Sequence, residues 1–407
     1  MAVTDEIPEE RVTEYPEEIG RVVMISGSFP PMPCGVGDSA HELACALAAA
    51  GVQVEILTDI GAHAADQDTC PIAVHPEIGS WGLGRIKKLV RSVESLSPDI
   101  LHIHYPTKAY GRGLAIPFLP MLIRARRRRF RIVTTLHEFR LSHPFRKLAT
   151  FLLIDPSDAI VMPCPLELAA LKRRHVSVEE KIHAAIPVGP VGPSPDGFDE
   201  ARRAELRNRI RQGWRVGDDQ VVLLHYGIPT PSKGIEVIFK ALRLLGLEGE
   251  TPILMIVGDF SPKANDFHRL LYGQPGGLGV RDQVRWLGRC LSEELPGIFL
   301  ASDIGVFPFL DGFSLRRSSL VGVLNWGLPI VTTEPDGDLP EVEGQQKVRF
   351  VARNDAKALA TALLPLVANP RSLEVAKSAD NRLMDLFRWD RIAGQYVDIY
   401  RQVMKKR

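Results

Sequence analysis

Short apolar runs alternate with helix-like segments along most of this chain, and this alternation constrains the fold more than any other feature. Apolar runs in the first half lie at 21–26, 52–58, 99–103, 131–136 and 158–162. Those in the second half lie at 220–226, 252–257, 283–287, 303–307 and 328–332. Apolar strands separated by helices are typical of a parallel sheet that helices cover on both faces. The sequence therefore predicts an α/β protein.

The rhythm breaks once, at 186–218. This segment begins with the Pro- and Gly-rich IPVGPVGPSPDG and continues with the charged FDEARRAELRNRIRQG, which together predict an interdomain linker. A chain of 407 residues also exceeds the usual size of one hydrophobic core. We expect two doubly wound Rossmann-like domains that face each other across a cleft. The predicted boundaries are an extension at 1–20, domains at 21–187 and 219–384, a linker at 188–218, and a closing helix at 385–407.

Composition narrows the class of protein. The net charge of +1 favours neither nucleic acid nor an anionic membrane as a global partner. The five cysteines lie far apart without a Cys-x-x-Cys pair, which predicts a reducing cytoplasm and neither a disulfide framework nor a structural zinc site. No apolar run approaches the roughly 18 residues of a membrane span, and the acidic N-terminus resembles no signal peptide. We expect a cytoplasmic protein.

The segment 308–329 reads PFLDGFSLRRSSLVGVLNWGLP. It resembles the donor-binding motif of the family-4 (group 1) retaining glycosyltransferases of the GT-B fold, where a Glu, then Gly-Phe-Gly, precedes a second Glu eight positions after the first. Here Asp311 stands at the first acidic position and Ser319 at the second. The resemblance implies that Asp311 binds hydroxyls of the transferred sugar and that the N–H groups of Ser314 and Leu315 meet phosphates. Ser319 replaces the acid that binds the ribose.

The segment LLHYGIPTPSKGIEVIFKAL resembles the family's diphosphate-binding loop. Lys233 and Gly234 match it, but Ile228 stands where the family has an Arg. A diphosphate in a closed cleft needs cations and N–H donors, so we expect Lys233 to bind it. We expect Arg316 to replace the missing Arg; since adjacent helical residues diverge by about 100°, Arg317 should then point away.

A glycine pair in the first half, Gly35 and Gly37, allows two interpretations. Gly-x-Gly-x-x-Ala followed by Asp59 formally fits a dinucleotide site, but the long Pro-containing loop before Gly35 favours the family's donor loop. At the start of a helix predicted over 38–50, small residues permit close approach of a negative group.

Histidines follow or end two of the predicted strands. His137, after the run 131–136, matches the family histidine that reaches the donor sugar, although a loop carbonyl could instead satisfy it. Glu138 could orient that imidazole or cap the turn. His102 and His104 share one face of a strand, and packing or positioning is favoured over metal binding.

The resemblance implies transfer of a sugar, with retention, from a nucleotide diphosphate sugar to an acceptor hydroxyl, with His137 and Asp311 as catalytic residues and without metal or other cofactor. The acceptor would be a glycan, a lipid-linked molecule or a small molecule. The alternative is a non-catalytic GT-B partner or scaffold of an active enzyme, since the Arg at 228 and the Glu at 319 are absent.

Two further segments carry alternatives. The basic run 124–130, RARRRRF, could dock the protein peripherally on the anionic inner face of a membrane, or its cations could simply complement a helix dipole. The last segment has one apolar stripe and a Trp389–Asp390 pair like the family's closing helix, which crosses back to the first domain; an ordinary amphipathic helix is the other interpretation. The stripe consists of Ile392, Tyr396, Ile399 and Val403.

Overall fold

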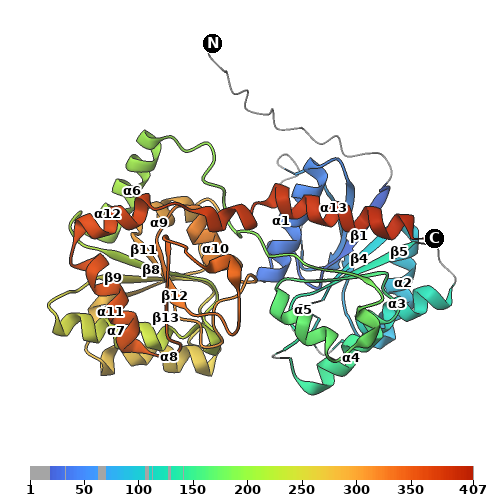
Figure 1. The fold of residues 1–407 in the computed structure, drawn as a ribbon, viewed down its shortest axis with the longest axis horizontal. Helices are drawn as coiled ribbons and strands as arrows, with labels where there is room; N and C mark the ends of the chain where they lie inside the picture. Colours follow the sequence, from blue (N-terminus) through green and yellow to red (C-terminus); the bar gives the residue numbers. More distant parts are fainter. Residues whose placement is uncertain are drawn as a thin grey trace, which may run out of the picture.

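The computed structural model describes residues 19–32, 34–62, 70–105, 110–111, 113–126, 130–140 and 142–406. It contains two sheets that lie side by side in Figure 1. The first has seven strands in the order β3-β2-β1-β4-β5-β6-β7, and the second has six in the order β10-β9-β8-β11-β12-β13. The described strand pairs of both sheets are parallel. The predicted fold of two doubly wound domains is confirmed.

The first sheet is built from the residues before Ile186. Its elements are β1 (Arg21–Ile25), α1 (Gly35–Ala49), β2 (Gln53–Asp59), β3 (Ala73–Ile78), η1 (Leu83–Arg85), α2 (Ile86–Ser95), β4 (Ile100–Tyr105), α3 (Ala115–Ala125), β5 (Arg131–Leu136), α4 (Pro144–Ile154), β6 (Ala159–Met162), α5 (Pro165–Lys172), η2 (Val176–Val178) and β7 (Ile182–Ala185). The sequence patterns missed one edge strand of the second sheet, β13 (Val348–Val351), and both edge strands of this sheet, β3 and β7. Neither is a buried apolar run: β3 contains a proline and exposed residues, and β7 is half-buried throughout.

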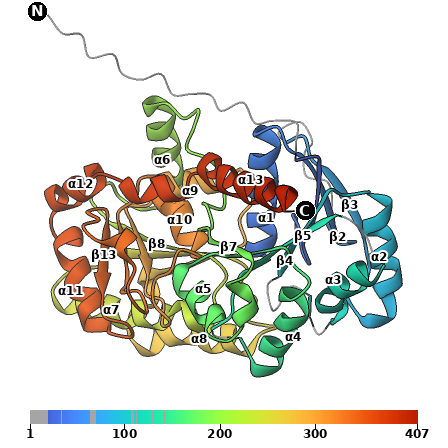
Figure 2. The same cartoon turned by 45° about the vertical axis from the view of Figure 1, so that its right-hand side comes forward.

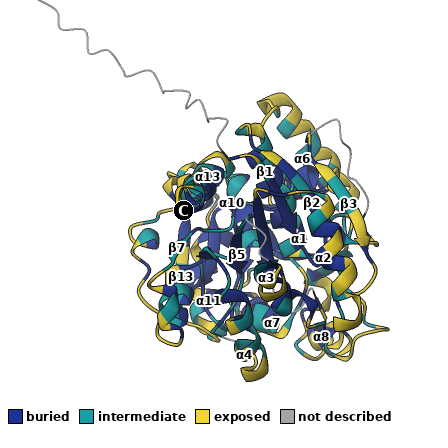
Figure 3. Ribbon diagram, turned by 90° about the vertical axis from the view of Figure 1, so that its right-hand side faces the viewer, coloured by how far each residue is buried: buried dark blue, intermediate teal, exposed yellow. Residues whose placement is uncertain are grey.

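The second sheet and its helices follow. They are α6 (Glu200–Trp214), β8 (Val222–Tyr226), η3 (Pro231–Lys233), α7 (Ile235–Leu247), β9 (Ile253–Val257), α8 (Asp266–Gly277), η4 (Arg281–Gln283), β10 (Val284–Gly288), α9 (Leu295–Ala301), β11 (Ile304–Phe307), α10 (Ser318–Asn325), β12 (Ile330–Thr333), η5 (Pro340–Val342), β13 (Val348–Val351), α11 (Ala356–Val367), α12 (Pro370–Ser378), η6 (Arg382–Leu386) and α13 (Trp389–Lys405). Figure 3 shows buried strands inside and exposed outer faces on many of the helices.

The charged half of the predicted linker forms helix α6, which packs against α9. Its Arg211 is 1% exposed, and a guanidinium nitrogen lies 3.2 Å from Asp303 Oδ2. Asp303 also accepts the backbone N–H of Val222 at the start of β8. A buried Arg needs such a partner because an unpaired charge in the interior is very costly. Helix α6 is therefore attached to the second sheet.

Helix α13 begins beside the second domain and lies over α1 and the first sheet in Figures 1 and 2. The predicted apolar stripe is buried, and it shares a hydrophobic core with residues of α1, β1 and β2. The indole N–H of Trp389 donates to the carbonyl of Pro190 at 3.0 Å. The last helix therefore connects the two domains through side-chain packing as well as through the chain.

One prediction from composition is wrong. Cys45 of α1 and Cys70 form a disulfide, with a Cα–Cα distance of 5.4 Å. The two residues are 25 apart in the sequence and show no motif, so only the return of the chain beside α1 brings them together. Within the described residues, His41, Cys45 and Cys70 are also the one group with the spacing of metal ligands, but the disulfide takes up two of its three ligand atoms.

Three residues of the basic run, 127–129, fall outside the described residues, as do 1–18 of the predicted extension. Arg126, at the end of α3, lies 3.4 Å from Glu94, and Arg124 bonds to Asp158. No described helix is both long and apolar enough to cross a membrane. Membrane docking through 124–130 stays a prediction.

Candidate functional site

The loop after β8 is shaped by close backbone approach. Gly234 adopts φ +65° where η3 passes into α7, and a Cβ on this residue would lie 2.1 Å from the carbonyl oxygen of Pro308. A side chain is therefore excluded on steric and conformational grounds. This turn therefore places Lys233, the residue before Gly234, close to the residues that follow strand β11.

Lys233 points toward helix α10. Its Nζ lies 3.3 Å from Ser319 Oγ and 5.0 Å from the centroid of the Phe309 ring. Burial and the nearby positive charge of Arg317 lower the pKa of Lys233 to about 7. The structure thus brings together two residues predicted from separate motifs, Lys233 and Ser319, at a place where positive charge is in excess.

Asp311 holds both arginines of the motif. Arg316 Nη2 lies 3.2 Å from Asp311 Oδ2, and Arg317 donates to Asp311 Oδ1 and to the carbonyl of Gly312. The guanidinium of Arg317 also lies 4.0 Å from the centroid of the Phe309 ring. The expectation that Arg317 would point away rested on helical geometry. Because α10 begins only at Ser318, both arginines lie in the turn before it.

Ser314 and Leu315 belong to the same turn. The hydroxyl of Ser314 is buried without a hydrogen-bond partner among the described residues. The carbonyl of Leu315 accepts the N–H of Val188, 3.0 Å away, from the segment that joins the domains. An unpaired buried hydroxyl at this point leaves a polar group available to a ligand.

His137 faces the motif from the first domain. It follows β5, and burial together with the charge of Arg316 lowers its pKa to about 4. Arg316 connects the two sides: it bonds to Asp311, and its Nη1 lies 3.9 Å from Glu138 Oε2. Asp311 and Glu138, the residue after His137, therefore lie on either side of one arginine.

A small cavity of about 30 Å³ lies between the domains at this point. Its lining comes from both sides, from Arg140, Cys164, Leu166 and Glu167 of the first domain and from Asp311, Phe313, Ser314, Arg316 and Asp336 of the second. Arg140 pairs with Asp336, which also lies 2.9 Å from Arg353. This ion pair therefore joins the two domains beside the cavity.

Sequence patterns did not identify Arg140, Glu167 or Asp336. Glu167 is 4% exposed, and its carboxylate accepts the backbone N–H groups of Phe139 and Arg140. It thereby fixes the backbone of the loop after His137. No local motif marks these residues, since their partners lie far away in the chain.

The glycine pair begins helix α1, three residues earlier than predicted. A Cβ on Gly37 would lie 2.7 Å from the carbonyl of Ser28, whereas Gly35 has open space around it. Arg289 of the second domain donates to the carbonyl of Pro31, so the preceding loop contacts the other side of the cleft. Asp59, the acid of the alternative dinucleotide interpretation, accepts the N–H of Gly61 in a local turn.

The strand histidines are hydrogen-bonded to protein groups. His102 contacts Thr135 and Tyr400, and His104 contacts His137. Neither belongs to the one group that could hold a metal within the described parts of the chain. This arrangement agrees with the positioning interpretation.

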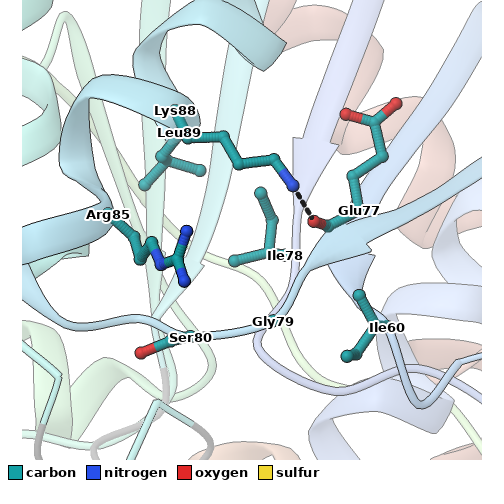
Figure 4. A pocket seen from close by; sticks show the side chains of 8 residues that line it. All are labelled: Ile60, Glu77, Ile78, Gly79, Ser80, Arg85, Lys88 and Leu89. Carbon is teal, nitrogen blue, oxygen red and sulfur yellow. Dashed lines mark hydrogen bonds between the residues drawn. The ribbon is translucent and has the colours of Figure 1, made fainter.

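A second, more open pocket of about 250 Å³ lies at the ends of β2 and β3 (Figure 4). Arg85 and Lys88 line it together with Glu77 and Ser80 above apolar residues. Lys88 Nζ donates to the carbonyl of Glu77 at 2.9 Å. The lining carries both signs of charge, and the residues predicted from the motifs lie elsewhere.

Family models match both halves of the chain. Residues 33–185 match Glycosyltransferase Family 4, and residues 220–369 match Glycosyl transferases group 1. The chain belongs to the group 1 GT-B glycosyltransferases. The two matched regions correspond to the two sides of the cleft. His137 lies in the first region, and the motifs around Lys233 and Asp311 lie in the second.

Several relatives support the assignment. An α-D-kanosaminyltransferase of Streptomyces kanamyceticus is 25% identical over 241 residues, which cover 57% of this chain and 59% of the relative. The matched regions span 59%, 53% and 57% of the first three curated relatives.

Among solved structures, sucrose-phosphate synthase of Thermosynechococcus elongatus superposes with a TM-score of 0.71 at 20% identity, covering 95% of this chain and all of that one (100%). HepE of Anabaena, in complex with UDP and glucose, gives 0.72 at 17% identity, covering 94% and 100%. These two similarities concern the fold.

Proposed function

We propose that this family member transfers a sugar from a nucleotide diphosphate sugar to an acceptor hydroxyl, with retention of configuration. The observation that carries the proposal is the cluster of Lys233, Arg316 and Arg317 around one carboxylate, Asp311. Asp311 is the nearest carboxylate to both arginines, Glu138 lies 3.9 Å from Arg316, and burial together with Arg317 lowers the pKa of Lys233 to about 7. Such a site gains most from an anionic ligand.

A diphosphate matches this cluster. Lys233 and Arg316 would neutralise its oxygens, the hydroxyl of Ser314 would donate to it, and the positive end of helix α10 would face it. The same groups would stabilise the negative charge on the diphosphate as it leaves, so the leaving group would not need to be protonated. The HepE relative was solved with UDP and glucose, so UDP-glucose is the first donor to test.

No divalent metal or other cofactor enters the proposal. In the cation cluster, Lys233 and the two arginines supply the positive charge that a metal would otherwise bring to a diphosphate. The acceptor would be a glycan, a lipid-linked molecule or a small molecule, bound on the side of the first domain, and peripheral docking through 124–130 would serve a lipid-linked one.

His137 and Asp311 would act on the sugar. Asp311 can accept hydrogen bonds from sugar hydroxyls with the oxygen lone pairs that its arginines leave free. The charge of Arg316, which bonds to Asp311, also lowers the pKa of His137, and the reacting sugar would sit between these residues beside the diphosphate. Since no carboxylate nucleophile comes from the motifs, the leaving phosphate would assist deprotonation of the acceptor.

Calorimetry with UDP-, GDP-, ADP- and dTDP-sugars in excess EDTA tests the donor. We expect one of them to bind with clear heat, and His137→Ala to lower turnover much more than donor affinity. If no donor binds at millimolar concentration, the proposal fails. Donor binding without transfer to any acceptor, and without slow donor hydrolysis, would instead favour the scaffold alternative.

A further inference from the structure

A chain of buried polar aromatic side chains leads from His137 to helix α13. His104 Nδ1 lies 3.2 Å from His137 Nε2, and the His104 ring lies 4.3 Å from the His102 ring between centroids. His102 Nδ1 lies 2.8 Å from the hydroxyl of Tyr400, and its Nε2 lies 2.8 Å from Thr135 Oγ1. A residue at the cleft is thus connected to the last helix of the chain.

The three histidines are neutral near pH 7. Burial lowers the pKa of His102 to about 3 and of His137 to about 4, and it lowers the pKa of His104 well below its usual value. Arg316 adds to the effect on His137. A neutral imidazole carries one N–H donor and one acceptor nitrogen. In the contact between His104 and His137, one ring therefore donates and the other accepts.

The unpaired nitrogen of His104 decides between these two arrangements. His104 Nε2 is buried and has no partner among the described residues. If His104 donates from Nδ1, this buried Nε2 is a bare acceptor. If His137 donates instead, the proton of His104 sits on Nε2 and becomes a buried N–H without an acceptor. Buried N–H groups without partners are rarer than buried acceptors without partners, so His104 should be the donor.

We propose that His104 is a positioning residue that holds His137 in its Nδ1–H tautomer, with Tyr400 and Thr135 fixing the histidine pair behind it. His137 Nε2 is then occupied as an acceptor, and Nδ1, which has no hydrogen-bond partner in the described part of the chain, presents an N–H. His137 would donate a hydrogen bond to an oxygen of the bound sugar or phosphate. It would not remove a proton from the acceptor.

Nitrogen NMR on the full-length protein with 15N-labelled histidine tests the tautomer directly. The His137 signal, assigned by its loss in His137→Asn, should show the proton on Nδ1. In His104→Leu the donor to Nε2 is lost, and the proton should move to Nε2 in a measurable fraction of molecules. A wild-type His137 that carries its proton on Nε2 overturns the proposal. This measurement needs no donor or acceptor, so its failure is distinct from failure of the proposed function.

Kinetics test the consequence, which rests on the proposed transfer. His104→Leu should lower kcat about tenfold, the effect of losing one well-placed hydrogen bond, while donor KM changes less than about threefold. His104→Asn should restore most of the rate, since its amide can donate from a position near Nδ1. Tyr400→Phe removes a single hydroxyl and should lower kcat severalfold.

The matched control is His183→Leu. His183 is a half-buried histidine of β7 that contacts the carbonyls of Val178 and Lys181, and it lies outside the site. It should leave kcat unchanged. Should His104→Leu not fold, His104→Asn and Tyr400→Phe still carry the test. Wild-type kcat in Tyr400→Phe, with the His137 tautomer also unchanged, would remove Tyr400 from the proposal; wild-type kcat in His104→Leu would overturn it.

Discussion

Lys233 Nζ lies 3.3 Å from Ser319 Oγ, so the lysine of the loop after β8 meets helix α10 at the position where the family has its second Glu. A Glu there would supply Lys233 with a carboxylate partner. Ser319 supplies only a hydroxyl, and the charge of Lys233 is left for a ligand. In the proposed function, a Ser at this position should weaken the ribose contact and favour binding of an anion by Lys233.

Lys233→Ala should weaken binding of the donor by roughly 1.5–3 kcal/mol, the scale of a hydrogen bond to a charged group. Isothermal calorimetry with UDP-glucose, or with whichever donor binds, measures this change. The control is Lys240→Ala on the same helix region, where the lysine is exposed. Equal affinities of the Lys233 variant and the wild type would show that the diphosphate binds elsewhere.

Donor affinity should fall as the pH rises above about 7. In the free protein the pKa of Lys233 is lowered to about 7. The diphosphate of a nucleotide sugar is fully ionised near neutral pH, and its charge raises the pKa of the lysine in the complex. The protonated lysine therefore binds better, and the complex takes up a proton above pH 7. Calorimetry between pH 6 and 9, in buffers of different ionisation enthalpy, checks both effects, and Lys233→Ala should lose them.

Arg316→Ala should mainly weaken donor binding, whereas Arg317→Ala should mainly lower thermal stability. Arg316 reaches from Asp311 to Glu138 across the cleft, so its loss should weaken donor binding by roughly 1.5–3 kcal/mol. Arg317 is held within its own domain by Asp311, by the carbonyl of Gly312 and by the Phe309 ring. Its loss should lower thermal stability more than affinity.

A further substitution should restore part of the donor affinity that Arg316→Ala loses. Ile228 is 37% exposed at the position of the family Arg, and Ile228→Arg should recover part of the affinity that Arg316→Ala loses. Thermal denaturation and calorimetry on the same samples separate the two roles. Normal donor binding by Arg316→Ala, together with weak binding by Arg317→Ala, would assign the roles the other way round.

Reduction of the Cys45–Cys70 disulfide should destabilise the protein. The bond links residues 25 apart, and closing a loop of this size stabilises by about 3 kcal/mol in the chain-entropy account. Urea denaturation with and without reductant measures the loss, and Cys45→Ser should abolish the difference. Cys290→Ser, at a free cysteine, is the control. Alkylation of all five cysteines in the unreduced, unfolded protein would exclude the bond.

Gly189→Ala should weaken the docking of α13. A Cβ on Gly189 would lie 2.5 Å from Cε2 of the Trp389 ring, so the side chain or the backbone must shift. We expect a loss of about 1–3 kcal/mol in stability, the usual cost of overpacking. Gly213→Ala is the matched control: it lies inside α6 with nothing within 4 Å of its Cβ and should be stabilising by roughly 0.5–1 kcal/mol. An unchanged melting temperature in Gly189→Ala would contradict the packing.

The sequence alone determined the fold class and the ends of the strands that carry the site. Alternating apolar runs require parallel sheets, because buried strands must be apolar on both faces, and loops at their ends follow from that topology. The motif around Asp311 and the pair Lys233–Gly234 could also be located from the sequence. Each is local, so spacing along the chain is enough to identify it.

Tertiary structure decided what depends on residues far apart in the sequence. The pairing of Lys233 with Ser319, the contact of Arg316 with Glu138, and the Arg140–Asp336 ion pair each join separate segments. The position of Arg317 shows the reason most clearly. Whether two adjacent side chains diverge or converge depends on where the helix begins, and α10 begins only at Ser318. That boundary is set by packing between the turn and its neighbours, which no periodicity in the sequence records.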